Sequence, residues 1–259
     1  MTGKPHDTHV ASQFGPRAAS YVTSAVHASG EDLTEIAKLA EQRKPNRALD
    51  LGCGGGHVSF HIAPHAGEVT AFDLSADMLG AVRAEARKHR LNNIITRRGS
   101  VERIDAVDAR FDFVASRYSA HHWHNIAAGL AEARRVLAPN GIAIFADAVA
   151  PETPLLDTHL QAMELLRDSS HVRDYSPSQW ISYLKAAGFS PAAPKLRRIR
   201  MEFASWVARM ATPASQVQAI RALQSTMPRD VTDYFELEAD GSFTIDAMTI
   251  EAGTVEAGI

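Results

Sequence analysis

The sequence has little cysteine, no long apolar run and no excess of either charge. Its single cysteine, Cys53, cannot form an internal disulfide, which suits a reducing compartment. No apolar stretch approaches the roughly 20 residues of a membrane helix, and the start of the chain lacks the apolar run of a signal peptide. Lys and Arg number 27 against 30 Asp and Glu, a formal charge of −3, so the charge requires neither nucleic acid nor an anionic membrane as partner. We therefore expect a soluble, cytoplasmic globular protein.

The composition that remains is that of one large domain, or of a domain with an elaboration. Of 259 residues, 45% are apolar and 22% charged, which is enough apolar material for a core. The middle of the chain alternates short apolar runs with amphipathic segments at 75–90 and 125–137. The apolar runs cover residues 48–51, 68–72, 94–95, 111–115 and 142–145. This alternation predicts an α/β fold, with a parallel sheet covered by helices on both faces.

The changes in apolar pattern along the sequence predict four parts. These are an N-terminal helical cap (1–45), a ligand-binding core (46–150), a helical insert or substrate lid (151–190), and a C-terminal part of the sheet with a helix (191–259). In the last part we expect a strand at 195–203 and a helix at 213–227. Asp240 and Gly241 lie between two short apolar runs and predict an antiparallel hairpin of strands at 235–237 and 243–245.

The strongest functional pattern is a glycine-rich turn directly after the first buried strand. Asp50, Gly52, Gly54 and Gly56 follow one another at alternate positions, and glycine lets a ligand approach the backbone closely. Asp73 ends the second strand about 20 residues later, where a carboxylate can accept hydrogen bonds from two ribose hydroxyls. The alternative interpretation is a tight turn whose glycines serve only packing. Loop and acid together favour a nucleotide site.

The spacing of the glycines distinguishes between nucleotides. The dinucleotide fingerprint would need a third glycine at position 57, which is His57. The loop and the segment Asp73-Leu74-Ser75 resemble the class I S-adenosylmethionine-dependent methyltransferases, and residues 99–102 and 135–141 extend the similarity to the small-molecule branch near the ubiquinone and menaquinone biosynthesis enzymes. The resemblance implies a Rossmann-like, mostly parallel sheet of seven strands with S-adenosylmethionine as cofactor.

The resemblance also implies a set of cofactor-binding residues. Ser100 stands where many relatives carry an Asp that accepts the adenine amino group, so it would be a weaker acceptor. Tyr21 and Phe14 are similar to lid residues that close over the cofactor, although core packing would explain them as well. The expected cofactor-binding residues are Asp50, Gly52, Cys53, Gly54, Asp73, Leu74, Ser100, Val101, Arg117 and Tyr21.

Histidines are the candidate catalytic residues. Methyl transfer to oxygen or carbon usually needs a proton removed, and histidine accepts protons near neutral pH. His121 and His122 follow the fourth strand and His171 lies in the insert, so all three are expected near the ligand-binding edge of the sheet. Structural, hydrogen-bonded histidines are the alternative. The Leu, Met and aromatic content of the insert and C-terminal segment predicts an apolar or aromatic small-molecule acceptor.

Other functions are less well supported by the sequence. The pairs His57/His61 and His121/His124 have metal-compatible spacing but lack the Glu or Cys partners of zinc sites, so no metal is predicted. The segment 116–119 lacks the motif that holds a base amine, which argues against RNA, and the basic clusters at 83–90 and 195–200 suit solvated faces. An RNA or protein methyltransferase, or a nucleotide-binding protein without transferase activity, are the alternatives. The sequence specifies no oligomeric state.

Overall fold

The core of the computed structural model is a mixed β-sheet, and the structure describes residues 5–18 and 30–254. Five parallel strands have the order β3-β2-β1-β4-β5, and β8 continues the sheet antiparallel to β5. The short strand β6 and the longer β7 both pair antiparallel with β8. The strands are β1 (Arg47–Leu51), β2 (Glu68–Asp73), β3 (Ile94–Arg98), β4 (Phe111–Arg117), β5 (Leu137–Val149), β6 (Phe189–Pro191), β7 (Lys195–Met201) and β8 (Phe243–Thr254).

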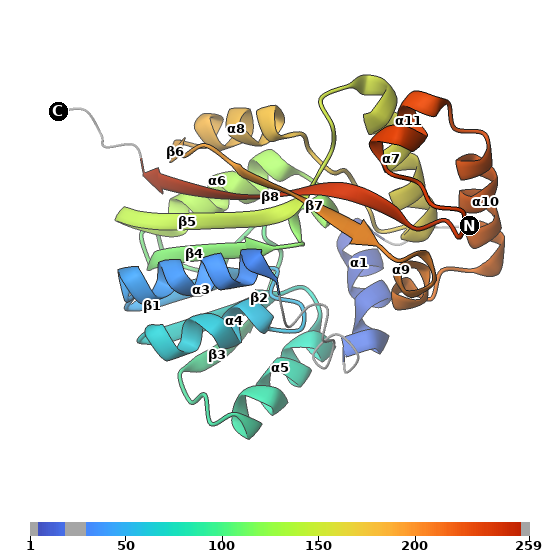
Figure 1. Cartoon of the computed structure of the whole chain (residues 1–259). Helices are drawn as coiled ribbons and strands as arrows, with labels where there is room; N and C mark the ends of the chain where they lie inside the picture. Colours follow the sequence, from blue (N-terminus) through green and yellow to red (C-terminus); the bar gives the residue numbers. More distant parts are fainter. Residues whose placement is uncertain (1–4, 19–29, 255–259) are drawn as a thin grey trace.

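Helices cover both faces of this sheet (Figure 1). One face packs on α6 (Ile126–Val136) and α8 (Pro177–Ala186), and the other on α3 (Glu31–Arg43), α4 (His57–Ile62) and α5 (Ala76–Lys88). Neighbouring side chains in β1, such as Ala48 and Leu49, are buried on opposite faces, which is why the strands read as unbroken apolar runs. The expected α/β fold with a mostly parallel sheet is confirmed, with eight strands in the described residues where seven were expected.

A second group of helices lies beyond the carboxyl ends of the parallel strands (Figure 1). It packs around its own apolar cluster together with β7 and the first half of β8. The segment expected as one insert at 151–190 is therefore divided, since its first helix joins this group and α8 packs on the sheet. None of the described helices is long and apolar enough to span a membrane. The group consists of α7 (Pro154–Arg167), α9 (Phe203–Met210), α10 (Ala214–Ser225) and α11 (Arg229–Tyr234).

Two expected boundaries in the C-terminal part were wrong. The residues predicted as a strand at 235–237 form the turn that follows α11, because Val231 and Phe235 are one helical turn apart and both are buried. The antiparallel partner of residues 243–249 is instead β7. The strand predicted to reach Phe203 ends at Met201, because the Glu202 carboxylate accepts hydrogen bonds from the next backbone amides and starts α9.

The strand order reverses between β1 and β4, and in open α/β sheets ligands bind at the carboxyl ends beside such a reversal. The short helix η3 (Ala120–His122) follows β4 at this edge, whereas η1 (Gly15–Arg17) and η2 (Ala63–His65) extend α1 and α4. The N-terminal helix α1 (His6–Phe14) lies over this edge, since His6 Nε2 is 2.9 Å from the carbonyl oxygen of His122 and His9 Nε2 is 2.9 Å from Ser169 Oγ. The fold thus encloses the reversal point between the core, α1 and the second helix group.

Candidate functional site

The glycine loop begins where β1 ends and is held by the neighbouring strand. The backbone amides of Gly52 and Cys53 both donate to the carbonyl oxygen of Phe72, at 2.9 Å each. Gly52 has φ of 72°, and a Cβ there would lie 1.9 Å from Ser119 Oγ, so this glycine permits close packing of the loop after β4. Gly54 has φ of 48°, and a Cβ there would meet nothing within 4 Å. Gly54 therefore leaves open space, as a loop that receives a ligand requires.

Two carboxylates shape this loop from opposite sides. Asp73 ends β2 and accepts from the backbone amide of Gly54 at 2.9 Å and from that of Ser75 at 2.8 Å. Burial raises the pKa of Asp73 above its ordinary value although these bonds oppose the shift. Asp50 accepts from the backbone amide and hydroxyl of Ser59, at 2.9 and 2.6 Å, and thereby ties β1 to α4. Burial raises the pKa of Asp50 to about 7.

A cavity of about 660 Å³ extends from the loop to the second helix group. That volume lies within the range of roughly 300–1,000 Å³ found for small-molecule sites. Tyr21 lies outside the described residues, whereas Phe14 is described and lines the cavity. The remaining expected cofactor residues all line this cavity: Asp50, Gly52, Cys53, Gly54, Asp73, Leu74, Ser100, Val101 and Arg117.

Arg117, at the end of β4, forms a buried ion pair with Asp32 at the start of α3. Its Nε lies 2.5 Å and its Nη2 3.2 Å from the two oxygens of that carboxylate, a bidentate arrangement. Both side chains are largely buried. Arg117 therefore joins the N-terminal segment to the floor of the cavity.

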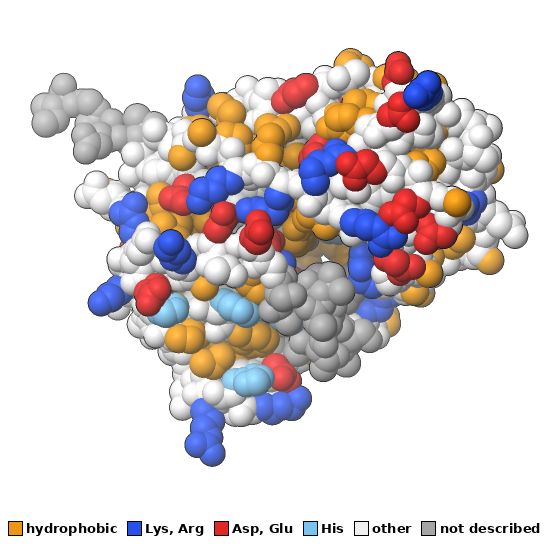
Figure 2. Space-filling view, in the orientation of Figure 1, with side chains coloured by type: hydrophobic (Ala, Val, Ile, Leu, Met, Phe, Trp, Pro, Cys, Tyr) orange, Lys and Arg blue, Asp and Glu red, His pale blue; other side chains and the backbone are white. Residues whose placement is uncertain are grey.

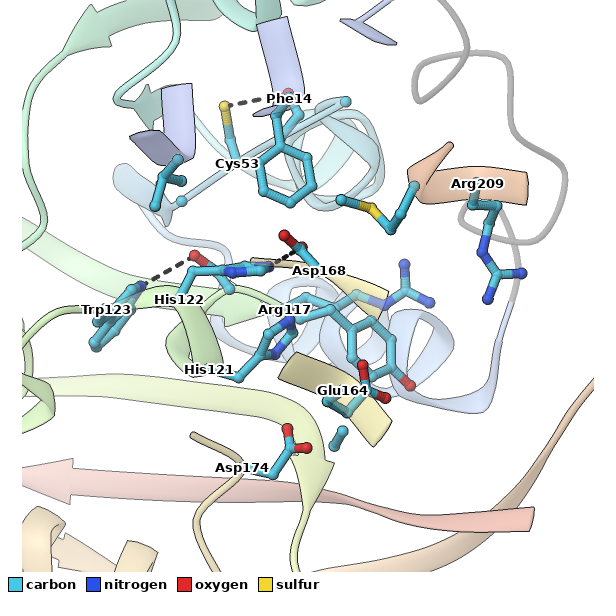
Figure 3. Close-up of a pocket in the computed structure, with 18 of the residues that line it drawn as sticks. Phe14, Cys53, Arg117, His121, His122, Trp123, Glu164, Asp168, Asp174 and Arg209 are labelled. Atoms are coloured by element: carbon cyan, nitrogen blue, oxygen red, sulfur yellow. Dashed lines mark hydrogen bonds and ion pairs between the residues drawn. The ribbon is translucent and has the colours of Figure 1, made fainter. Parts of the chain in front are cut away.

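The three candidate histidines lie together. The ring centres of His121 and His122 are 4.2 Å apart, and those of His121 and His171 are 5.8 Å apart. The first two line the cavity. His171 is not among the lining residues; its Nε2 lies 2.9 Å from Gln161 Oε1, behind the cavity wall. Phe14 packs edge-on against His122, with ring centres 5.0 Å apart (Figure 3).

The protonation states of these histidines diverge because only His121 has a carboxylate at hydrogen-bond distance. Asp168 lies 3.9 Å from His122 Nε2, and Asp174 lies 4.0 Å from His171 Nε2. His121 Nδ1 lies 2.6 Å from Oδ1 of Asp147, a residue of β5. Burial lowers the pKa of His121, but the charge and hydrogen bond of Asp147 outweigh it and raise that pKa to about 9. Burial and the charge of His121 lower the pKa of His122 to about 3 and that of His171 to about 2. At neutral pH the three histidines therefore carry one positive charge between them, which resides on His121.

Sequence reasoning missed the acidic residues that face these histidines. Glu164 and Asp168 line the cavity near the end of α7, and Asp174 lines it from the connection to α8. A signal existed for Glu164, because it follows Leu160 by one helical turn and so shares the buried face of α7. Figure 3 shows the labelled side chains running from Cys53 and Phe14, through the histidines, to Glu164 and Asp174.

The C-terminal segment, whose apolar content predicted an apolar acceptor, supplies an apolar wall opposite the loop, but its individual residues were not predicted. This wall comes from β7, α9 and β8, which are remote in sequence from the glycine loop. Trp206 stacks edge-on against Phe243, with ring centres 5.0 Å apart, which fixes the α9 side of the wall. The apolar side chains that line the cavity on this side are Ile199, Met201, Trp206, Met210 and Ile245.

In the described part of the chain, one group of three side chains has potential metal-ligand atoms close together. His121, Asp147 and Asp174 each bring such an atom within 4.8 Å of the others. This group differs from the histidine spacings considered from the sequence, since two of its members are carboxylates distant along the chain. Asp147 already accepts the hydrogen bond of His121 and those of the backbone amides of Ala120 and Ala148, which explains its position without an ion.

Comparisons with known proteins agree with this geometry. The profile of the family described as "Methyltransferase domain" matches residues 49–145. The chain is 42% identical over 201 residues to the uncharacterized protein YafE of Escherichia coli, covering 78% of this chain and 97% of that one. It is 32% identical over 243 residues to the uncharacterized methyltransferase YcgJ of Bacillus subtilis, covering 92% and 96%. The crystal structure of YcgJ superposes with a TM-score of 0.83 at 29% identity, covering 87% of this chain and 99% of that one.

A shorter match extends to quinone biosynthesis. The chain is 33% identical over 127 residues to the ubiquinone/menaquinone biosynthesis C-methyltransferase UbiE of Brucella anthropi, covering 47% of this chain and 48% of that protein. The resemblance inferred from the glycine loop and Asp73 is thereby confirmed.

Proposed function

This chain belongs to the methyltransferase domain family, and we propose that it transfers the methyl group of S-adenosylmethionine to a small molecule with an apolar body. The observation that carries this proposal is the single cavity that joins the glycine loop and Asp73 to the histidines and the apolar wall. A cofactor and an acceptor can meet in such a cavity with water largely excluded, which methyl transfer requires.

The residues around the loop fit the proposed cofactor. Open space beside Gly54 admits a ligand against the backbone, and the Asp73 carboxylate stands at the end of β2 where ribose hydroxyls would donate to it. Ser100 and Val101 line the same cavity at the adenine side expected from the family resemblance. When bound, S-adenosylmethionine supplies a methyl group on a sulfonium, which is already a good leaving group. The protein therefore needs mainly to align the acceptor.

The histidines divide the proton work in this proposal. His121 is the protonated member, held by Asp147, and donates hydrogen bonds. His122 is neutral, and its Nδ1 lies 3.1 Å from the carbonyl oxygen of Ser170, to which it can donate. Its Nε2 then keeps a lone pair, but a pKa so far below neutral makes His122 a weak proton acceptor, so we assign it to binding the acceptor. His171 does not line the cavity, so we assign it a positioning role through Gln161.

The distribution of charge supports a small-molecule acceptor over nucleic acid. On β7, Arg197 pairs with Glu35 at 2.8 Å and Arg198 with Asp246 at 3.2 Å. On α5, Lys88 pairs with Glu85 at 2.6 Å. Figure 2 shows Lys and Arg interspersed with Asp and Glu over this face. Basic side chains that are neutralised by acids make a poor surface for phosphates.

Calorimetry and label transfer test this function. We expect the purified protein to bind S-adenosylhomocysteine and not NAD. With S-adenosylmethionine labelled in its methyl group and a fractionated cell extract, label should enter the small-molecule fraction. The Asp73→Ala variant is the control that should lose this transfer. Label recovered only in RNA or in protein, or binding of NAD without S-adenosylhomocysteine, would contradict the proposal.

A further inference from the structure

The end of the cavity away from the glycine loop carries a buried carboxylate, Asp174, with one oxygen that forms no hydrogen bond to any described residue. Asp174 is 2% exposed and lines the cavity, and its Oδ2 has no hydrogen-bond partner in the part of the chain that the structure describes. Figure 3 shows this carboxylate directed toward His121 and Glu164. Buried polar atoms are almost always hydrogen-bonded, so an exception that faces a cavity indicates a ligand group.

The charges around Asp174 do not fully balance its ionised form. His121 is the nearest cation, but it already shares its proton with Asp147, and the ligand atoms of all three residues lie within 4.8 Å of one another. Arg167 is 3.2 Å from the Glu164 carboxylate. Asp147, Glu164 and Asp174 thus share the charges of His121 and Arg167. Burial together with the charge of Glu164 raises the pKa of Asp174 to about 8, so without a ligand Asp174 is mostly protonated at neutral pH.

His171 supplies no further positive charge. Its Nε2 is 4.0 Å from Asp174 Oδ2, and burial with the neighbouring positive charge of His121 lowers the pKa of His171, so it is neutral.

The backbone fixes where the Asp174 carboxylate stands. The amide of Asp174 donates to Gln161 Oε1 at 3.1 Å, which joins the connection to α7. The amides of Val172 and Arg173 both donate to the carbonyl oxygen of His121, at 2.8 and 3.2 Å. The backbone at Asp174 is therefore tied to two other elements, α7 and η3.

Apolar side chains line part of the cavity beyond Asp174, among charged ones such as Glu202 and Arg209. Trp206, Met210 and Ile245 line it, and the guanidinium of Arg167 lies 5.0 Å from the Trp206 ring centre while donating to the Trp206 carbonyl oxygen. A ligand that fills this space needs an apolar body, and the part of it that meets Asp174 needs hydrogen-bond donors.

We propose that Asp174 binds a protonated amine of the methyl acceptor, which is therefore an amine with an apolar body. An ammonium group offers several N–H donors and a positive charge, so it supplies the missing hydrogen bond to Oδ2 and favours the ionised form of Asp174. A hydroxyl group would donate one hydrogen bond but would bring no positive charge to favour the ionised carboxylate. This inference rests on the proposed function, because it assigns the acceptor of that same cavity.

Titration calorimetry on the protein saturated with S-adenosylhomocysteine tests the assignment. The probes are benzylamine, 2-phenylethylamine and hexylamine, each paired with the alcohol of the same carbon skeleton. At least one amine should bind about 10-fold or more tightly than its alcohol, as expected for a charged hydrogen bond. In Asp174→Asn, that amine should lose about 10- to 100-fold in affinity while the alcohol stays within about threefold.

Controls separate this inference from the proposed function and from folding. Asp108→Asn removes a carboxylate that is 79% exposed and pairs with Arg135 outside the cavity, and it should leave the amine preference unchanged. If Asp174→Asn does not melt cooperatively, the same titrations are made with Asp174→Ser.

Each outcome of the titration has a separate meaning. Failure to bind S-adenosylhomocysteine would refute the proposed function. Normal binding without amine preference, or with a preference that persists in Asp174→Asn, would overturn this inference alone. Stoichiometric binding of Mn²⁺ or Zn²⁺ that Asp174→Asn abolishes, without amine preference, would overturn it in favour of a metal ion.

Discussion

Replacing Asp73 by Asn is expected to weaken cofactor binding much more than it weakens the fold. The carboxylate accepts from the amides of Gly54 and Ser75, at 2.9 and 2.8 Å, and in the proposed complex it also accepts from the ribose. An Asn at this position keeps one acceptor oxygen but presents an NH₂ group where the second oxygen stood. One backbone amide or the ribose then loses its acceptor, and the charge is lost as well.

The size of the effect follows from these bonds. A hydrogen bond to a charged group contributes roughly 1.5–3 kcal/mol, which corresponds to about 10- to 150-fold in affinity. The folded protein loses less, because burial already disfavours the Asp73 charge, as its raised pKa indicates. The lost acceptor and the relieved burial oppose each other, so we expect the unfolding free energy to change by less than about 2 kcal/mol.

Calorimetry with S-adenosylhomocysteine and thermal melting measure the two effects separately. Asp112→Asn is a matched control, because Asp112 also accepts two backbone amides, those of Asn46 and Arg47, at 2.9 and 3.0 Å. It lies at the start of β4, at the opposite edge of the sheet, and does not line the cavity. Its replacement should affect stability but not binding. If a folded Asp73→Asn protein binds S-adenosylhomocysteine as tightly as the wild type, the assignment of Asp73 is wrong.

Three further predictions concern the loop and the histidines. Gly54→Val should abolish the thermal stabilisation by S-adenosylhomocysteine, because a β-branched side chain tolerates φ of 48° badly and would fill the open space; an unchanged shift in melting temperature would refute this placement. His121→Ala and His171→Ala should each reduce kcat far more than they reduce affinity for S-adenosylhomocysteine. Steady-state kinetics measure the first effect and calorimetry the second, and a larger loss of affinity than of kcat would refute this prediction. The His121–Asp147 pair should add stability below pH 6.5 that disappears as pH rises toward 9, since the folded pKa of about 9 lies above the ordinary 6.5; the loss is about 3 kcal/mol. Chemical denaturation across this pH range should show a steeper decline for the wild type than for His121→Gln, and parallel declines would count against the pair.

Local sequence patterns were sufficient for the parallel core and for one half of the site. The apolar runs at 48–51 and 111–115 belong to strands that are buried on both faces of the sheet. Such strands need apolar residues at nearly every position, which makes them recognisable from the sequence alone. The glycine loop and Asp73 follow directly from strand ends, and parallel strands bring their carboxyl ends to one edge by topology alone. The hairpin expected between 235–237 and 243–245 was wrong, because three alternating residues fit the turn after a helix as well as they fit a strand.

The other half of the site depends on contacts between residues remote in sequence, and only the tertiary structure decides it. In the sequence, Asp147 is only an acidic residue within an apolar strand. In the structure its Oδ1 lies 2.6 Å from His121 Nδ1, and this contact makes the pKa of His121 differ from that of His122. In the sequence, Asp174 is indistinguishable from other loop residues. In the structure, backbone hydrogen bonds join the segment between α7 and α8 to η3 and to α7 and so place Asp174 at the cavity. Neither burial nor charge balance is a property of a local pattern, because both depend on which other elements surround a side chain.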